Sequence, residues 1–281
     1  MKIALAGKGG VGKTTVSALL ITLFAEKGHR VFAVDADPDA NLGATLGFPP
    51  DLLDRQPPII EMKEIVEERT GQGAYLVLNP DVADLFDRFS LTLGNVRLFR
   101  MGGVKPAGTQ CYCRENAFLK ALVGALVLRP EDLVVLDMGA GIEHLSRGTA
   151  RGVDLLLVVT EPTRVSAQSA ATILRLARDL GVPAVRVLGN KVRSERERAF
   201  LEETFGPDLL AVLPYDDEVA EAALGGGGEA ASGGGRAAPG GGPDRGLFAS
   251  GAATAAGRRL EELYPGIVRL AGGSTSGPIT F

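Results

Sequence analysis

The chain reads Gly7-Lys8-Gly9-Gly10-Val11-Gly12-Lys13-Thr14-Thr15 directly after the short apolar run Ile3-Ala4-Leu5-Ala6. Apolar residues then recur at helical spacing from residue 16 to residue 27. A buried strand, a glycine loop and a helix in this order turn the pattern G-x-x-x-x-G-K-[ST] into a phosphate-binding loop. Its glycines let consecutive backbone N–H groups point at an anion, and the start of the helix adds a positive dipole end.

The pattern predicts a nucleotide with Mg²⁺ and gives the loop residues separate tasks. The Lys13 side chain is expected to reach the β- and γ-phosphates as a catalytic group, and the Thr14 hydroxyl to bind Mg²⁺. The alternative is a glycine-rich turn that binds no ligand. The residues expected to contact the nucleotide are Gly9, Gly10, Val11, Gly12, Lys13, Thr14 and Thr15.

Lys8 is not required by the general pattern. With it, the loop resembles the deviant Walker A motif (K-G-G-x-G-K-T) of the MinD/ParA/nitrogenase-iron-protein class of ATPases. The resemblance implies that ATP is the nucleotide and that Lys8 acts in trans, crossing to the partner subunit's ATP in a dimer. The alternative for Lys8 is a solvated surface lysine.

Carboxylates follow the second predicted strand, in the run Asp35-Ala36-Asp37-Pro38-Asp39. At the carboxyl end of a strand beside a phosphate loop, such groups can hold Mg²⁺-bound water or orient an attacking water. The run resembles the switch I segment of the same class, which implies that Asp37 positions the hydrolytic water and that Asp35 lies in the outer shell of Mg²⁺. The alternative is that Asp37 or Asp39 caps a helix over residues 40–46.

Three further residues are assigned to the nucleotide site. Asp137 ends an apolar strand, as expected of a Walker B aspartate. The resemblance implies that Asn190 hydrogen-bonds the adenine and that the turn at Pro214 lies against it through backbone contacts.

Cys111 and Cys113 are the two cysteines of the chain and precede a helical run that extends to Leu128. Their spacing disfavours a structural disulfide, and a helix start favours the metal-binding thiolate. One pair supplies two of the four thiolates that a closed soft-metal site takes, and a symmetric dimer would supply the rest. Taken alone, the pair is also compatible with two incidental buried thiols.

A narrower resemblance rests on this pair, followed by Arg-Glu-Asn-Ala, and on Gly-Ile-Glu-His-Leu-Ser-Arg-Gly-Thr after the Walker B aspartate. Both resemble the carbon monoxide dehydrogenase maturation ATPases, the CooC group, over roughly residues 1–222. The resemblance implies a homodimer bridged by ATP and by Ni²⁺ (or Zn²⁺) at Cys111 and Cys113, with carbon monoxide dehydrogenase or another nickel enzyme as client. One departure is Gly139, where that group usually has an acidic residue.

Alternating strands and helices predict an α/β fold: a doubly wound, mostly parallel sheet with helices on both faces, the P-loop NTPase architecture. Residues 1–224 are expected to form the ATPase domain and residues 225–281 a glycine-rich, flexible tail with a short helix at 252–264. A natural linker and a shifted reading frame both explain such a tail. The expected core strands are 2–6, 30–35, 96–101, 132–137, 154–160, 184–189 and 209–213.

Composition bears on partners and location. The formal net charge of −4 gives no indication of a nucleic-acid or membrane partner. Sparse cysteines, the absence of a fitting signal peptide and the lack of an apolar run of about 20 residues favour the cytoplasm. Two rival functions remain: a positional scaffold ATPase like MinD or ParA, and an electron-transfer ATPase, for which one adjacent cysteine pair is a poor match.

Overall fold

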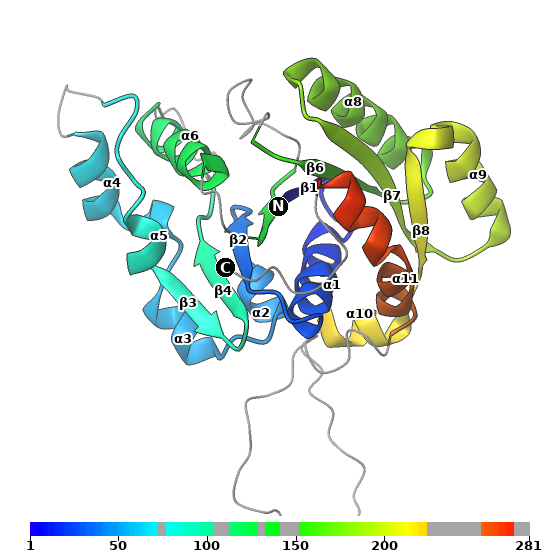
Figure 1. Ribbon diagram of the computed structural model, residues 1–281, viewed down its shortest axis with the longest axis horizontal. Helices are drawn as coiled ribbons and strands as arrows, with labels where there is room; N and C mark the ends of the chain where they lie inside the picture. Colours follow the sequence, from blue (N-terminus) through cyan, green and yellow to red (C-terminus); the bar gives the residue numbers. More distant parts are fainter. Residues whose placement is uncertain (72–76, 104–112, 129–132, 141–151, 224–253, 273–281) are drawn as a thin grey trace, which may run out of the picture.

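A single sheet organises the computed structural model, which describes residues 1–71, 77–103, 113–128, 133–140, 152–223 and 254–272. In these residues the sheet has eight strands in the order β3-β4-β2-β5-β1-β6-β7-β8 (Figure 1). Every pairing is parallel except that of β3 with β4. The strands are β1 (Lys2–Gly7), β2 (Val31–Ala36), β3 (Ser90–Leu93), β4 (Val96–Arg100), β5 (Leu133–Met138), β6 (Leu155–Thr160), β7 (Ala184–Val192) and β8 (Leu209–Pro214).

The predicted fold class is confirmed, and all seven expected strands are present. Strand β3 was not predicted, because it is an edge strand whose residues are half-buried or exposed. It forms a hairpin with β4 through Gly94, which adopts a φ of 55°. Glycine takes this left-handed conformation without strain.

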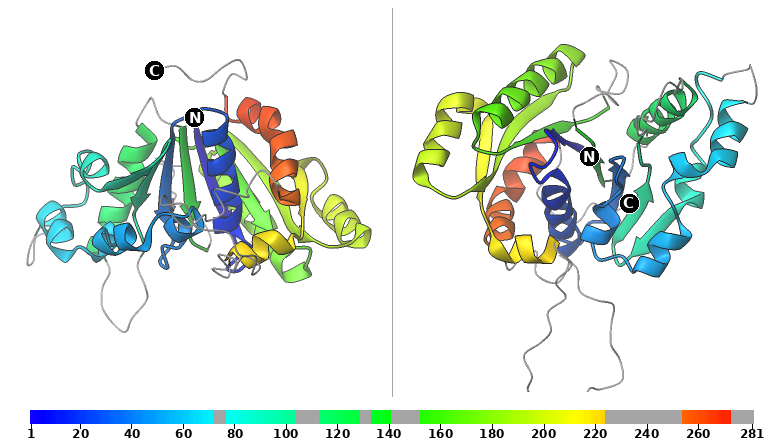
Figure 2. Two further views of the ribbon diagram at one scale, coloured as in Figure 1. Left: turned by 90° about the horizontal axis from the view of Figure 1, so that it is seen from below. Right: turned by 180° about the vertical axis from the view of Figure 1, so that it is seen from behind.

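Two helical layers cover the sheet, as seen from below and from behind in Figure 2. Ile3 and Leu5 of β1 face a core shared with α1, α2 and α11, whereas Ala4 and Ala6 face a core shared with α4, α5, α6, α8 and α9. This alternation is the period of two that a strand buried on both faces shows. The helices are α1 (Lys13–Glu26), α2 (Leu42–Thr45), α3 (Pro50–Arg55), α4 (Lys63–Thr70), α5 (Leu85–Arg88), α6 (Cys113–Leu128), α8 (Arg164–Leu180), α9 (Glu195–Phe205), α10 (Asp217–Ala223) and α11 (Ala255–Leu270). Short 3-10 turns lie at Ile59–Glu61 and Gly206–Asp208.

Residues 255–270 were expected to belong to a flexible tail, but in the structure they form helix α11. It packs against α1 and β8, and its Leu260 and Ile267 are fully buried. Tyr264 Oη and His29 Nε2 lie 2.7 Å apart, and Lys27 pairs with Glu261 at 2.6 Å. The helix runs past the predicted end at 264, and its amphipathic packing argues against a shifted reading frame over 255–270. The boundary at 224 and the glycine-rich residues up to 253 lie outside the described residues, so their expected flexibility stays a prediction.

Leu260→Ala is expected to destabilise the protein by about 3 kcal/mol, because the truncation leaves a cavity between α11, α1 and β8. Urea unfolding monitored by circular dichroism measures the effect. Glu262→Ala on the solvent side of the same helix is the matched control and should change stability by less than about 0.5 kcal/mol. Equal stability of Leu260→Ala and the parent chain would contradict the assignment of α11 to the core.

No helix within the described ranges combines the length and the apolar character needed to span a bilayer.

Candidate nucleotide site

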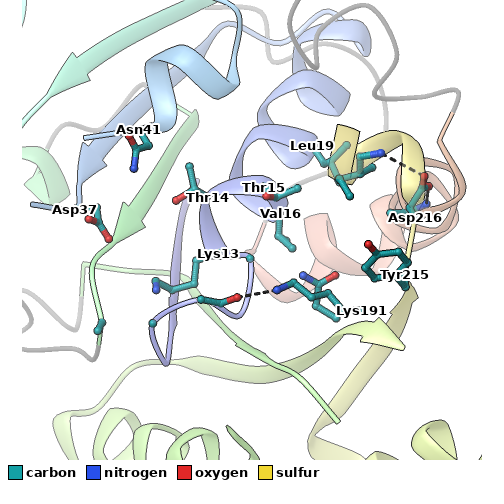
Figure 3. Close-up of a pocket in the computed structure, with 18 of the residues that line it drawn as sticks. Lys13, Thr14, Thr15, Val16, Leu19, Asp37, Asn41, Lys191, Tyr215 and Asp216 are labelled. Atoms are coloured by element: carbon teal, nitrogen blue, oxygen red, sulfur yellow. Dashed lines mark hydrogen bonds between the residues drawn. The ribbon is translucent and has the colours of Figure 1, made fainter. Parts of the chain in front are cut away.

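A cavity of about 830 Å³ opens at the carboxyl ends of the parallel strands, next to the first turn of α1 (Figure 3). Its volume lies within the range of small-molecule sites. Segments far apart in the sequence meet around it: the glycine loop, the residues after β2, and the residues after β7 and β8. The predicted site residues that line it are Gly9, Gly10, Gly12, Lys13, Thr14, Thr15, Asp37, Asn190 and Pro214.

The glycine loop has the conformation that an anion cradle needs. Gly10 and Gly12 adopt φ values of 83° and 89°, which side chains rarely tolerate. A Cβ at Gly9 or Gly10 would meet no described atom within 4 Å, so this side of the loop is open. A Cβ at Gly12 would lie only 2.5 Å from Asn190 Nδ2. The Val11 side chain is buried in the core, which leaves its backbone for ligand contacts.

Lys13 begins α1 and is 6% exposed, with its Nζ donating a 3.3 Å hydrogen bond to the Lys8 carbonyl oxygen. An ammonium buried to this extent needs anionic partners, and the Asp137 carboxyl, whose pKa the charge of Lys13 lowers, is one of them. The site is therefore electrostatically prepared for a phosphate, and the catalytic role of Lys13 stays a prediction.

Asp35 and Asp137 are opposite each other on adjacent strands β2 and β5, and both are fully buried. Asp35 accepts hydrogen bonds from the Leu42 and Asp37 backbone N–H groups at 2.9 and 3.3 Å. Burial and the charge of Asp137 raise the pKa of Asp35 to about 7. Burial also raises the pKa of Asp137 to about 6, against the lowering effect of the neighbouring Thr14 and Ser17 hydroxyls.

These residues fit Mg²⁺. Asp137 Oδ1 accepts a 2.9 Å hydrogen bond from Ser17, whereas Oδ2 is buried and has no hydrogen-bond partner among the described residues. A buried, raised-pKa carboxylate beside a threonine hydroxyl is stabilised by a hard cation, which takes oxygen ligands. Thr14 would hold the ion, and Asp137 and Asp35 would balance its charge from beneath.

Asp37 is half-buried at the rim of the cavity, and its Oδ1 accepts from the Asp39 N–H at 2.9 Å. The capping alternative is not what the structure shows. Helix α2 begins at Leu42 without a side-chain cap from Asn41, and the carboxylate that receives its first N–H is that of Asp35. Asp37 lines the cavity, and its role as the water-positioning residue stays a prediction.

Gly139 lies against switch I. A Cβ at this position would be 3.2 Å from Pro38 Cδ and 3.7 Å from Asp37 Oδ2. An acidic side chain here would start in tight contact with Pro38 and near a like charge. The departure at Gly139 thus matches the packing of Pro38 in this chain.

The part of the cavity next to β7 and β8 includes residues that the sequence motifs did not assign. The Arg193 guanidinium stacks on the Tyr215 ring at 3.6 Å from the centroid, and both residues line the cavity. Lys191, next to the predicted Asn190, reaches the glycine loop. Asp216 accepts hydrogen bonds from Glu218 at the start of α10 and from Ala256 at the start of α11. The sequence feature from which this contact could have been predicted is the lysine that directly follows Asn190.

Lys8 lies apart from the other loop residues. It is exposed, does not line the nucleotide cavity, and borders a second hollow of about 710 Å³ with Val165 and Leu176 of α8. These two α8 side chains are 60% and 43% exposed. An exposed lysine that does not line its own nucleotide cavity fits a role toward another subunit, which stays a prediction.

The cysteine pair is described only in part. Cys111 lies outside the described residues, and Cys113 is the first residue of α6, without a described side chain. Within the described residues no three His, Cys, Asp or Glu side chains form a metal-binding group.

The fold and this site define a P-loop nucleotide-binding protein of the deviant, two-lysine type. Residues 2–227 match the CobQ/CobB/MinD/ParA nucleotide binding domain, so the chain belongs to this family of ATPases. The carbon monoxide dehydrogenase accessory protein CooC of Rhodospirillum rubrum is 41% identical over 231 residues, which cover 80% of this chain and 88% of that protein. The predicted resemblance to the CooC group is confirmed.

Two further comparisons agree. An uncharacterized ATP-binding protein of Methanocaldococcus jannaschii is 39% identical, covering 79% of this chain and 88% of its own. The crystal structure of a ParA family ATPase from Chlorobium tepidum superposes with a TM-score of 0.61 at 16% identity, covering 93% of this chain and 96% of the other. At this identity the latter shows the fold alone.

Proposed function

We propose that the protein is an ATP-dependent, homodimeric metallochaperone of the cytoplasm that delivers nickel to carbon monoxide dehydrogenase or a related nickel enzyme. The observation that supports this most is the 41% identity to CooC over most of both chains. This identity is well above the 16% shared with the ParA family ATPase of Chlorobium tepidum.

In this proposal ATP and Mg²⁺ occupy the cavity, with Lys13 and the loop N–H groups on the phosphates and Thr14 on the ion. Asp37 orients the attacking water, and Lys8 reaches the nucleotide of the partner subunit. Asn190 and the Pro214 turn contact the adenine. The γ-phosphate supplies the contacts that differ between the ATP and ADP states, which is what a switch requires.

Cys111 and Cys113 of each subunit would bind the metal between the two protomers. Cys113 starts a helix of 16 residues, whose positive end lowers a thiol pKa. Four thiolates from two chains fit Ni²⁺ and also Zn²⁺. The metal is the cargo of the cycle, released to the client when hydrolysis reopens the dimer.

A positional MinD- or ParA-like role is the second candidate, favoured by the shared fold. Membrane attachment through α11 would compete with its packing, because Leu260 and Ile267 are buried against α1 and β8. Binding of liposomes or DNA only in the presence of ATP would support this role over the metal carrier.

The test is nickel titration into reduced apo protein with and without MgATP, followed by metal analysis and light scattering. About one metal per dimer is expected, with at least a tenfold loss of affinity in Cys111→Ser/Cys113→Ser. The double variant should still dimerise with ATP, which separates metal binding from the nucleotide switch. Cysteine-independent metal binding would overturn the carrier proposal while leaving the ATPase intact.

A further inference from the structure

Two consecutive residues at the end of β7 donate side-chain hydrogen bonds to the backbone of the glycine loop. Asn190 Nδ2 donates a 2.9 Å hydrogen bond to the Val11 carbonyl oxygen. Lys191 Nζ donates a 2.7 Å hydrogen bond to the Gly10 carbonyl oxygen, the dashed line that ends at Lys191 in Figure 3. Two successive carbonyl groups of the loop are therefore fixed by side chains more than 170 positions away.

The geometry of the peptide bond gives these contacts a consequence for phosphate binding. In a trans peptide the C=O and N–H groups of one unit point in opposite directions, and the structure contains no cis bond in the described residues. A Gly10 carbonyl drawn toward Lys191 turns the Val11 N–H the other way, and a Val11 carbonyl drawn toward Asn190 does the same for the Gly12 N–H. These are N–H groups of the anion cradle.

The backbone of Lys191 is shaped for this contact. Lys191 has a φ of 59°, a left-handed conformation that is unfavourable for residues other than glycine. The pairing of β7 with β8 shifts register between Gly189 and Val192, which redirects the strand at this point. Backbone strain of this kind persists only where the surrounding structure enforces it.

Glu161, the residue that follows β6, forms an ion pair with Lys191. The Glu161 Oε1 atom lies 2.6 Å from Lys191 Nζ. The Glu161 backbone N–H donates a 3.1 Å hydrogen bond to Ser166 Oγ in the first turn of α8. The ammonium is thus held between a carboxylate and a loop carbonyl, with its side chain 41% exposed. One ion pair joins the ends of β6 and β7 to the glycine loop.

We propose that Lys191, held by Glu161, is a positioning residue that sets the conformation of the glycine loop for phosphate binding, together with Asn190. This role requires only that the chain binds nucleotide and is independent of its metal cargo. Lys191 lines the cavity, so a direct contact with the base is the competing role. The two roles differ in which part of the nucleotide they affect.

The test uses the charge-neutral pair Lys191→Met/Glu161→Gln, which removes one positive and one negative charge together. Calorimetric titration with MgADP and with magnesium pyrophosphate is expected to show about tenfold weaker binding of both, the loss typical of a charge-assisted hydrogen bond. Adenosine, measured by competition, is expected to bind within about twofold of the parent chain. In a chain that already has Lys191→Met, adding Glu161→Gln should not weaken the binding of either ligand further. Its one expected effect is to remove a carboxylate that has lost its partner.

The matched control is Lys27→Met/Glu261→Gln, a Lys–Glu pair of the same 2.6 Å length between α1 and α11 and away from the glycine loop. It should leave all three affinities unchanged. Thermal melting confirms that each variant folds. Unchanged pyrophosphate affinity in the Lys191 pair would overturn the proposal, and a loss confined to adenosine and ADP would assign Lys191 to the base instead.

Discussion

Asp137→Asn is expected to lower Mg²⁺-dependent ATP hydrolysis strongly while making the apo protein more stable. The loss of turnover should be roughly 10²–10³-fold, because the carboxylate that would balance the charge of Mg²⁺ near Thr14 is gone. The substitution is isosteric, and the Ser17 hydroxyl can still donate to the remaining oxygen, 2.9 Å away in the parent chain. The fold should therefore be retained.

The gain in apo stability follows from the raised pKa of Asp137. This pKa is about 6 in the folded state, compared with the ordinary aspartate value of 3.8 that applies to the unfolded state. Well below pH 3.8 the side chain is protonated in both states and has no effect on unfolding. As the pH rises from about 4 to 6, the unfolded state ionises first, so the folded state loses stability. Above pH 6 the penalty is complete, and about two pKa units correspond to at most roughly 3 kcal/mol.

Melting temperatures in EDTA at pH 7.5 and pH 4.5, together with steady-state ATPase rates, measure both effects. The variant should melt above the parent chain at pH 7.5, and the difference should shrink at pH 4.5. Asp51→Asn, an exposed aspartate on α3, is the control and should change neither quantity. A variant that is less stable at pH 7.5, or that keeps its turnover, would refute this account of Asp137.

Lys8→Ala is expected to lower ATP turnover by roughly 10³-fold or more and to remove ATP-driven dimerisation, as for a cation supplied in trans. Its affinity for MgADP should stay within about twofold of the parent chain, because Lys8 does not line its own nucleotide cavity. Light scattering with MgATP and steady-state kinetics measure these effects. Lys120→Ala, an exposed lysine of α6, is the matched control.

Mixing two inactive variants distinguishes trans from cis action. In a dimer of Lys8→Ala with Asp37→Asn, a trans-acting Lys8 leaves one complete site: the intact Asp37 on one chain and the intact Lys8 on the other. An equimolar mixture should regain up to about a quarter of the parent activity, the limit reached if the two variants associate at random, when half of the dimers are mixed and each has one working site. The recovered activity falls below this limit to the extent that the Lys8→Ala chain weakens association. If Lys8 acts in cis, both sites remain defective and the mixture stays inactive.

Local sequence patterns were sufficient to predict the fold class and to select residues that line one cavity. A strand, a glycine loop and a helix follow one another directly in the chain, so their local arrangement can be predicted from the sequence. The seven apolar runs formed strands as expected. The carboxyl ends of parallel strands lie at one edge of a sheet, so the sequence alone could place Asp37, Asn190 and Pro214 beside Lys13.

Other features depend on contacts between distant segments, and these emerged only from the folded chain. Helix α11 follows a glycine-rich stretch, and only its packing on α1 and β8 shows that Leu260 and Ile267 belong to the core. The Lys191 contact with Gly10 and Glu161 needs a register shift and a left-handed residue, neither of which periodicity reveals. Side-chain direction at a bulge is set by the neighbouring strands, so a linear pattern cannot predict it.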